Sequence, residues 1–155
     1  MKIDQNLLSE IASKATESSS RALSLLIGQE VTVKTTQATY LRIDRLVDLV
    51  NAQGEEEIVA FSQLISGVKG AAFLIMDHPH ALHLVDALMK KPDGTTKELA
   101  DIDKSAIRET LNILSNSQLT ALAKDLGITV SVMPPSLIAR ERIADVLDYL
   151  AAHQG

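Results

Sequence analysis

A row of short polar side chains between residues 105 and 116 has residue types and a spacing that suit chemistry. Ser105, Glu109, Asn112 and Asn116 follow one another at intervals of 4, 3 and 4 residues, which places them along one side of a helix. The other side of that helix carries apolar residues, namely Ile107, Leu111, Leu114, Leu122 and Leu126. A carboxylate and an amide would therefore face outward, toward a partner protein. Asn116 is either part of this row or an ordinary surface amide.

A second group of candidate ligands lies in the segment 77–83, DHPHALH. His80 and His83 are spaced i, i+3 beside Asp77, and a divalent cation can accept such donors. The same residues also form a helix start, with Asp77 as N-cap and Pro79 in the first turn. We favour the helix start and expect no metal site in this chain.

The composition is typical of one domain with an aliphatic core. The chain has 155 residues, of which 46% are hydrophobic and only 3% aromatic, so Leu, Ile, Val and Ala must fill the interior. A chain of this length can bury such a core without disulfides or a metal. It contains no Cys, which excludes thiol chemistry and is typical of a reducing compartment.

Charge and hydropathy argue against two classes of partner. The net charge is −5 and the basic residues are scattered, so the basic surface of a nucleic-acid-binding protein is missing. The longest apolar runs, such as 71–76, are much shorter than the roughly 18 residues of a membrane-spanning helix. The N-terminus, with acidic Asp4 and Glu10, does not resemble a signal peptide. We therefore expect a cytoplasmic protein that binds neither nucleic acid nor membrane.

Periodicity and turn residues predict the elements that position the polar row. Asp4 is a suitable N-cap for a helix that ends at Ile27, before Gly28. Gly67 and Gly70 permit a tight reversal and predict a hairpin. The predicted elements after the first helix are a strand at 31–35, a short helix at 43–51, hairpin strands at 57–65 and 71–76, a helix at about 79–91, and a long helix, a Gly turn and a strand within 105–135.

The chain also contains an internal repeat with an offset of 99 residues. Glu10 corresponds to Glu109 and Gly28 to Gly127. We predict a single α+β domain, 1–155, in which repeat one covers about 1–91 and repeat two about 101–155. Each unit would contain a helix, a strand, a short helix and a hairpin, with the long helices packed on a mainly antiparallel sheet. The second copy reaches Gly155 where its hairpin would begin, so we expect the sheet to lack two strands.

The polar row resembles the signature of the CheC, CheX and FliY family, phosphatases of the chemotaxis response regulator CheY. Ser105, Glu109, Asn112 and Pro135 match its Asp or Ser, Glu, Asn and Pro at every spacing, including the 22 residues before Pro135. Without Pro135, a solvated helix surface would be the simpler interpretation of Glu109 and Asn112. The full motif inside a repeat favours a functional site.

The first repeat departs from this signature. Its corresponding positions are Asn6, Glu10, Ser13 and Thr36, so only the Glu is retained. A serine hydroxyl cannot reach or orient a water molecule as a carboxamide does. The resemblance therefore implies one active site, in the second half, and a silent, degenerate site at Glu10 and Ser13.

The resemblance implies hydrolysis of an aspartyl phosphate on a CheY-type regulator. The regulator brings Mg²⁺ and a Lys to the phosphoryl group, so this chain needs no cofactor of its own. Positioning of the attacking water provides most of the catalysis in phosphoryl transfer. Asn112 would orient that water and Glu109 would dock the regulator through its Lys, with Ser105 and Pro135 in support.

A second interpretation is a non-catalytic member of the same family that binds a regulator, a flagellar-switch protein or CheD without turnover. The intact Asn112 favours the enzyme, because docking alone gives no reason for the amide. The expected sheet edge invites pairing with another chain, and we expect a homodimer joined through it.

Overall fold

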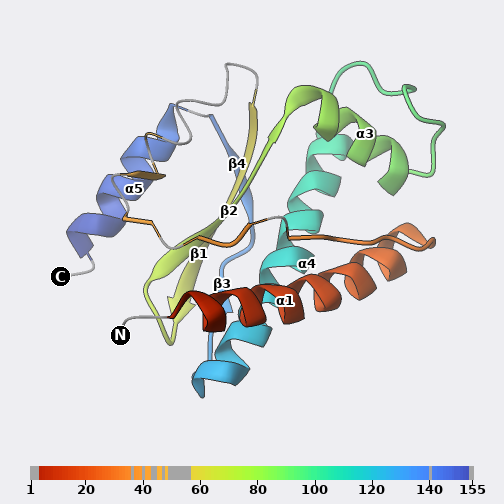
Figure 1. The fold of residues 1–155 in the computed structure, drawn as a ribbon. Coiled ribbons are helices and arrows are strands. Elements are labelled where there is room, and N and C mark those ends of the chain that lie inside the picture. Colours follow the sequence, from red (N-terminus) through yellow and green to blue (C-terminus); the bar gives the residue numbers. More distant parts are fainter. Residues whose placement is uncertain are drawn as a thin grey trace.

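The computed structural model describes residues 4–35, 37–39, 41–42, 45–46, 48, 57–139 and 141–153. A sheet separates α5 (Arg142–His153) on one face from α3 (His78–Leu88) and α4 (Asp101–Leu126) on the other (Figure 1). The first helix, α1 (Gln5–Ile27), packs against α4. This is the α+β architecture that the sequence predicts. Within the described ranges, no helix is both long and apolar enough to cross a membrane.

The sheet is built around β1 (Glu57–Ser66). On one side, β2 (Gly70–Asp77) forms the predicted antiparallel hairpin with β1, from Glu57 opposite Asp77 to Leu64 opposite Gly70. On the other side, β1 pairs with two short antiparallel strands, β3 (Ser131–Val132) and β4 (Ser136–Ile138). The strand predicted after Gly127 is therefore present as two short pieces.

Successive residues of β1 belong to two separate cores. Val59 packs against the buried residues of α5, which are Ile143, Leu147 and Leu150. Its neighbour Ala60 packs on the opposite face against buried residues of α3 and α4, which are Ala81, Val85, Ile107 and Leu111. This alternation is the period of two of a strand. The second core holds the inner side of α4, and Ser105 and Glu109 on the opposite side of its first half are exposed.

The two long helices pack antiparallel to each other. Ser19 Oγ lies 2.9 Å from Ser117 Oγ, and Lys14 Nζ lies 3.1 Å from Asp125 Oδ2. Each helix ends at a glycine with a left-handed backbone, Gly28 with φ 76° and Gly127 with φ 66°, as the sequence predicts. These matching ends agree with an internal repeat, which itself stays a prediction.

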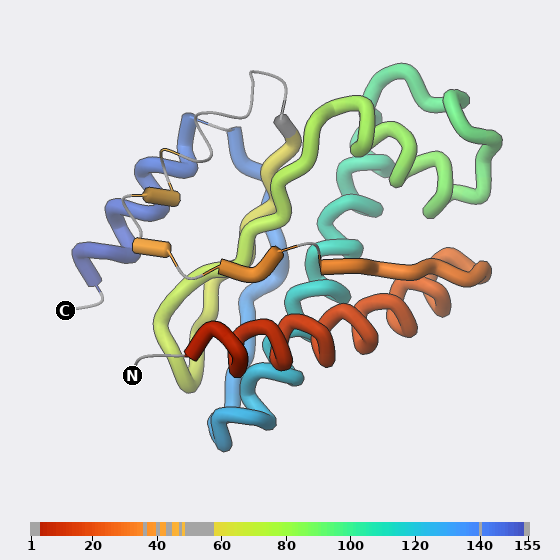
Figure 2. The backbone as a smooth tube through the Cα atoms, viewed as in Figure 1, coloured from red at the N-terminus to blue at the C-terminus, as the bar shows by residue number. Residues whose placement is uncertain are grey.

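Residues 31–35 do not form the strand that we predict from the sequence. Their backbone instead runs back along α1 (Figure 2). The N–H of Val31 donates to Ser24 Oγ at 2.9 Å, and the N–H of Val33 donates to Ser20 Oγ at 2.8 Å. Two serines of α1 thus satisfy the backbone groups that a neighbouring strand would otherwise satisfy.

Two other predicted helices differ in extent from the sequence expectation. The helix predicted at 79–91 is α3, which begins after its N-cap Asp77 and ends at Leu88. Lys90 follows with a left-handed φ of 54°, which cannot continue a helix. Most of the helix predicted at 43–51 lies outside the described residues, of which Arg45, Leu46 and Asp48 are helical.

Candidate functional site

The motif residues of α4 lie together on its outward side. Ser105 and Glu109 are exposed and Asn112 is half-buried. On the inner side of the helix, Ile107 and Leu111 are buried in the core shared with α3. Since residues three and four apart are neighbours on a helix surface, the structure brings the three polar side chains together as their spacing predicts.

Asp103 fixes the start of the helix that carries the motif. This residue is only 3% exposed, and its Oδ2 accepts the N–H of Ala100 at 2.9 Å. Its Oδ1 lies 4.0 Å from Lys91 Nζ. A carboxylate in the first turn also suits the positive end of the helix dipole. The motif is therefore presented by a helix whose beginning is anchored.

The side chains of Asn112 and Asn116 are joined by hydrogen bonds. Nδ2 of Asn116 donates to the backbone carbonyl of Asn112 at 2.7 Å and to its Oδ1 at 3.0 Å. Ser115, which is 3% exposed, donates its hydroxyl to the same carbonyl at 3.3 Å. The half-buried amide of Asn112 is therefore held by its neighbour on the next turn.

The hydroxyl of Ser105 is used within α4. It donates to the backbone carbonyl of Asp101 at 3.0 Å and accepts a bond from Arg108 Nη2 at 2.7 Å. Ser105 thus holds the guanidinium beside the start of the motif. Its proton is not available to a reacting group in this arrangement.

Pro135 lies in the link between β3 and β4, and it is half-buried. The link interrupts the pairing with β1, because a proline has no N–H to donate to a strand ladder. Leu137, two residues later, packs against the core of Ile107 and Leu111. Pro135 is therefore tied to the inner side of α4 through the strand that follows it, β4, and no hydrogen bond among the described residues joins it to Glu109 or Asn112.

The two motif glutamates have different surroundings. Glu10 Oε1 lies 3.0 Å from Lys14 Nζ, which also contacts Asp125. The bond to Glu10, followed by that to Asp125, raises the pKa of Lys14 above its usual value. Glu109, by contrast, makes no ion pair within the described part of the chain. The motif spacing does not point to Lys14, but its position four residues after Glu10 on a predicted helix is a sequence signal for this ion pair.

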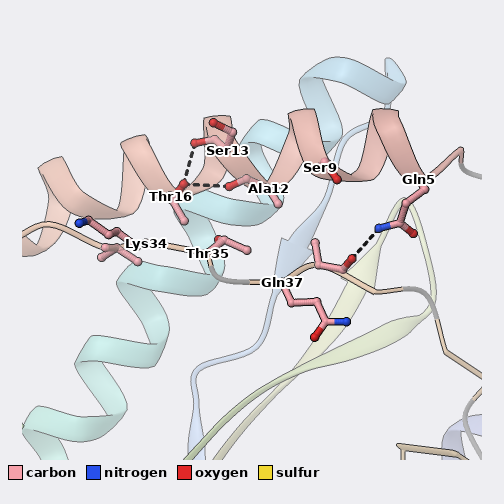
Figure 3. A pocket seen from close by; sticks show the side chains of 10 residues that line it. Gln5, Ser9, Ala12, Ser13, Thr16, Lys34, Thr35 and Gln37 are labelled. Carbon is pink, nitrogen blue, oxygen red and sulfur yellow. Dashed lines mark hydrogen bonds between the residues drawn. The ribbon is translucent and has the colours of Figure 1, made fainter.

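Ser13, the counterpart of Asn112, lines a hollow of about 590 Å³ between α1 and the segment 33–38. Figure 3 shows this hollow, with the hydroxyl of Thr16 bonded to the carbonyls of Ala12 and Ser13. Gln5 closes one end by donating to the carbonyl of Ala38 at 2.7 Å. The space beside the first motif is lined by several hydroxyls together with Lys34 and the carboxamides of Gln5 and Gln37, whereas position 13 itself offers no carboxamide. Thr36, the counterpart of Pro135, lies outside the described residues.

The histidines of α3 bond to separate carboxylates. His80 Nδ1 lies 2.6 Å from Asp77 Oδ1, and His83 Nδ1 contacts Asp93. Asp77 also accepts the backbone N–H of His80 at 2.8 Å, as its predicted role of N-cap requires. In the ranges that the structure describes, no cluster of three or more His, Cys, Asp or Glu side chains could hold a metal ion.

Comparison with known proteins identifies relatives of this chain by sequence and by fold. No family model matches the chain. The chain is 28% identical over 120 residues to the CheY-P phosphatase CheC of Bacillus subtilis (strain 168), an alignment that covers 76% of this chain and 57% of CheC. The chain thus spans little more than half the length of that relative.

Solved structures share the fold. The FliY structure from Thermotoga maritima superposes with a TM-score of 0.75 at 22% identity, covering 91% of this chain and 73% of FliY. A chain of the CheX–CheY–BeF3–Mg²⁺ complex from Borrelia burgdorferi gives a TM-score of 0.51 at 17% identity, with coverage of 92% of this chain and 80% of that one. The chain is therefore similar in sequence to CheC, and it shares its fold with FliY and CheX structures.

Proposed function

We propose that the chain hydrolyses the aspartyl phosphate of a CheY-type response regulator. The observation that supports this best is the pair Glu109 and Asn112, which lie one turn apart on the outward side of a helix whose inner side is buried. A relative of the chain is a CheY-P phosphatase. The similar CheX structure contains CheY, BeF3 and Mg²⁺, which agrees with a metal that belongs to the regulator.

In the proposed reaction, a water oxygen attacks phosphorus and the bond between phosphorus and the aspartyl oxygen breaks. The regulator's aspartate and inorganic phosphate are the products, and the water proton passes to solvent. Asn112 holds the water in line through its carbonyl oxygen and NH₂ group. Glu109, which has no cationic partner among the described residues, pairs with the regulator's Lys. Such a pair is weak in water but stronger once the interface covers it.

The decisive experiment measures how fast a phosphorylated CheY-type regulator loses its phosphate, alone and with catalytic amounts of this protein. Wild type should accelerate the loss, and Asn112→Ala should return the rate to that of the regulator alone. Ser13→Ala is the matched control at the corresponding position of α1 and should leave the rate unchanged. Equal rates with wild type, Asn112→Ala and no added protein would overturn the proposal.

Docking without turnover is the second candidate, and the loss of Asn at Ser13 favours it because one motif of the chain has already lost its amide. Binding of the phosphorylated regulator, or of CheD, without any acceleration by wild type would establish that role.

The outer edge of β2 has no strand partner among the described residues, so we further propose a homodimer joined at the sheet edge. Light scattering that finds only monomers at high concentration would exclude it.

A further inference from the structure

The contact between Asn112 and Asn116 determines which way both amides point. A backbone carbonyl can only accept a hydrogen bond, so the Asn116 atom 2.7 Å from the Asn112 carbonyl must be the NH₂ nitrogen. The other hydrogen of that NH₂ group is directed at the Asn112 side chain. The side-chain atom that receives it at 3.0 Å must therefore be the acceptor Oδ1. The main chain thus fixes the orientation of both side chains.

This arrangement leaves a defined set of groups on Asn112 for other molecules. Oδ1 uses one of its two lone pairs on Asn116 and keeps the other. The Nδ2 of Asn112 is turned away from Asn116, and no described residue accepts a bond from it. One acceptor site and one NH₂ donor of the half-buried Asn112 are therefore left without a partner among the described residues, and a water molecule requires this set from an orienting amide.

Stability does not explain the presence of an asparagine at position 116. Its side chain is exposed, it lies inside a helix, and asparagine favours helix formation less than alanine does. Nor is the pair present in the first repeat, where the corresponding residues are Ser13 and Glu17, and Glu17 pairs with Arg21 at 3.4 Å. The two amides occur together only in the half that retains the full motif.

We infer that Asn116 is a positioning residue that holds the Asn112 amide in the orientation needed to direct the attacking water. This inference rests on the proposed phosphatase function and adds a residue outside the family signature. An amide that is free to rotate spends part of its time with donor and acceptor exchanged or in another rotamer. The hydrogen bond from Asn116 keeps the Asn112 amide in one orientation, so that no time is spent in unproductive ones. It does this without adding a contact to the regulator.

The kinetic test compares Asn116→Ala with the control Gln118→Ala. Gln118 is also an exposed amide of α4, but its side chain makes no hydrogen bond among the described residues. Asn116→Ala should lower kcat by up to about a hundredfold, which is the loss that a 1 Å misplacement of a catalytic group can cause. Its KM and its affinity for the phosphorylated regulator should be unchanged, and its Tm should be equal or higher. In an Asn112→Ala background, Asn116→Ala should cause no further loss.

A spectroscopic test is independent of turnover. In isotope-labelled wild type, the scalar couplings about χ1 and the residual dipolar couplings of the Asn112 side-chain amide should report one orientation, and in Asn116→Ala they should report an average over several. Unchanged couplings, or a loss of kcat no larger than in Gln118→Ala, would overturn the positioning role even if wild type is an active phosphatase. If wild type shows no phosphatase activity, the proposed function fails and the positioning role fails with it, whatever the couplings show.

Discussion

Glu10 of the degenerate first motif is neutralised within the chain by Lys14, whose Nζ lies 3.0 Å from Glu10 Oε1. The residue at the corresponding position of the second repeat is Ile113, which cannot pair with Glu109. Lys14 therefore occupies the place that the regulator's Lys would take on an active motif. In terms of the proposed mechanism, the first motif lacks the amide that would orient the water, and its carboxylate already has a cationic partner within the chain.

Both changes must be reversed to obtain a working site on α1. In an Asn112→Ala background, Ser13→Asn combined with Lys14→Ile should restore measurable acceleration of regulator dephosphorylation, whereas Ser13→Asn alone should restore less because Lys14 still pairs with Glu10. Adding Glu17→Asn should raise the rate further by supplying the counterpart of Asn116. Lys14→Ile alone is the control and should stay inactive. Equal activity with and without Lys14→Ile would contradict the competition.

Glu109→Gln should weaken docking more than chemistry. Loss of the carboxylate removes the pair with the regulator's Lys, so KM should rise by about tenfold while kcat changes little. The dependence of KM on salt should also become shallower, since fewer charges attract across the interface. Steady-state dephosphorylation at two ionic strengths measures both effects. Glu10→Gln, at the same position of α1, should have no effect, and a rise in KM there would show that the first motif also docks the regulator.

The N-cap of α3 predicts a pH dependence of stability. The backbone N–H of His80, together with its ring, lowers the pKa of Asp77 from its ordinary 3.8. Because the folded-state pKa is depressed, this stabilisation is fully present above the unfolded-state pKa and is lost as the pH falls through the folded-state value. Asp77→Ala should therefore lower Tm at neutral pH, and its difference from wild type should shrink below pH 3.8.

Thermal unfolding across a pH series measures this effect, and Asp77→Asn is the matched control. Asparagine is as good an N-cap as aspartate but does not titrate. Its Tm should stay near that of wild type at neutral pH. A difference between wild type and Asp77→Ala that stays constant down to the lowest pH would argue against the carboxylate as its source.

The crossing of α1 and α4 should tolerate a smaller residue better than a larger one. Ser19 is fully buried, and its hydroxyl meets Ser117, which also donates to the carbonyl of Leu114 at 3.0 Å. Ser19→Ala leaves that bond intact and should cost about 0.5–1 kcal/mol of unfolding free energy. Ser19→Leu forces the helices apart and should cost about 1–3 kcal/mol. Urea unfolding would test this order, and equal costs would mean that the crossing is loosely packed.

Local signals predict the helices of this chain well and its sheet partners less well. Gly28 and Gly127 end the long helices in the left-handed conformation that their sequence positions suggest. The segment 31–35 is extended as its alternation indicates, but Ser20 and Ser24 bind it. Alternation of apolar and polar residues indicates an extended segment with one buried side. It does not indicate the hydrogen-bond partner of that segment, which depends on the groups that the tertiary structure brings near.

The candidate site is predictable where it is helical. Helical spacing is enough to bring Ser105, Glu109 and Asn112 together. Helical spacing cannot reveal that the Ser105 hydroxyl accepts a hydrogen bond from Arg108, because that bond depends on side-chain rotamers. The relation of Pro135 to the helix depends on strand pairing across more than sixty positions of sequence, with Val59 opposite Ile138, and no local pattern encodes such a register.

The strand β1 supplies every ladder in the described sheet, since β2, β3 and β4 each pair with it. Its residues belong to the first predicted repeat, whereas β3 and β4 belong to the second. Within the described residues, β3 and β4 each pair with β1 and not with each other. If the chain arose from a duplicated unit, the described strands of its two copies have become interdependent, because the half that carries Glu109 and Asn112 pairs its strands with a strand of the first half.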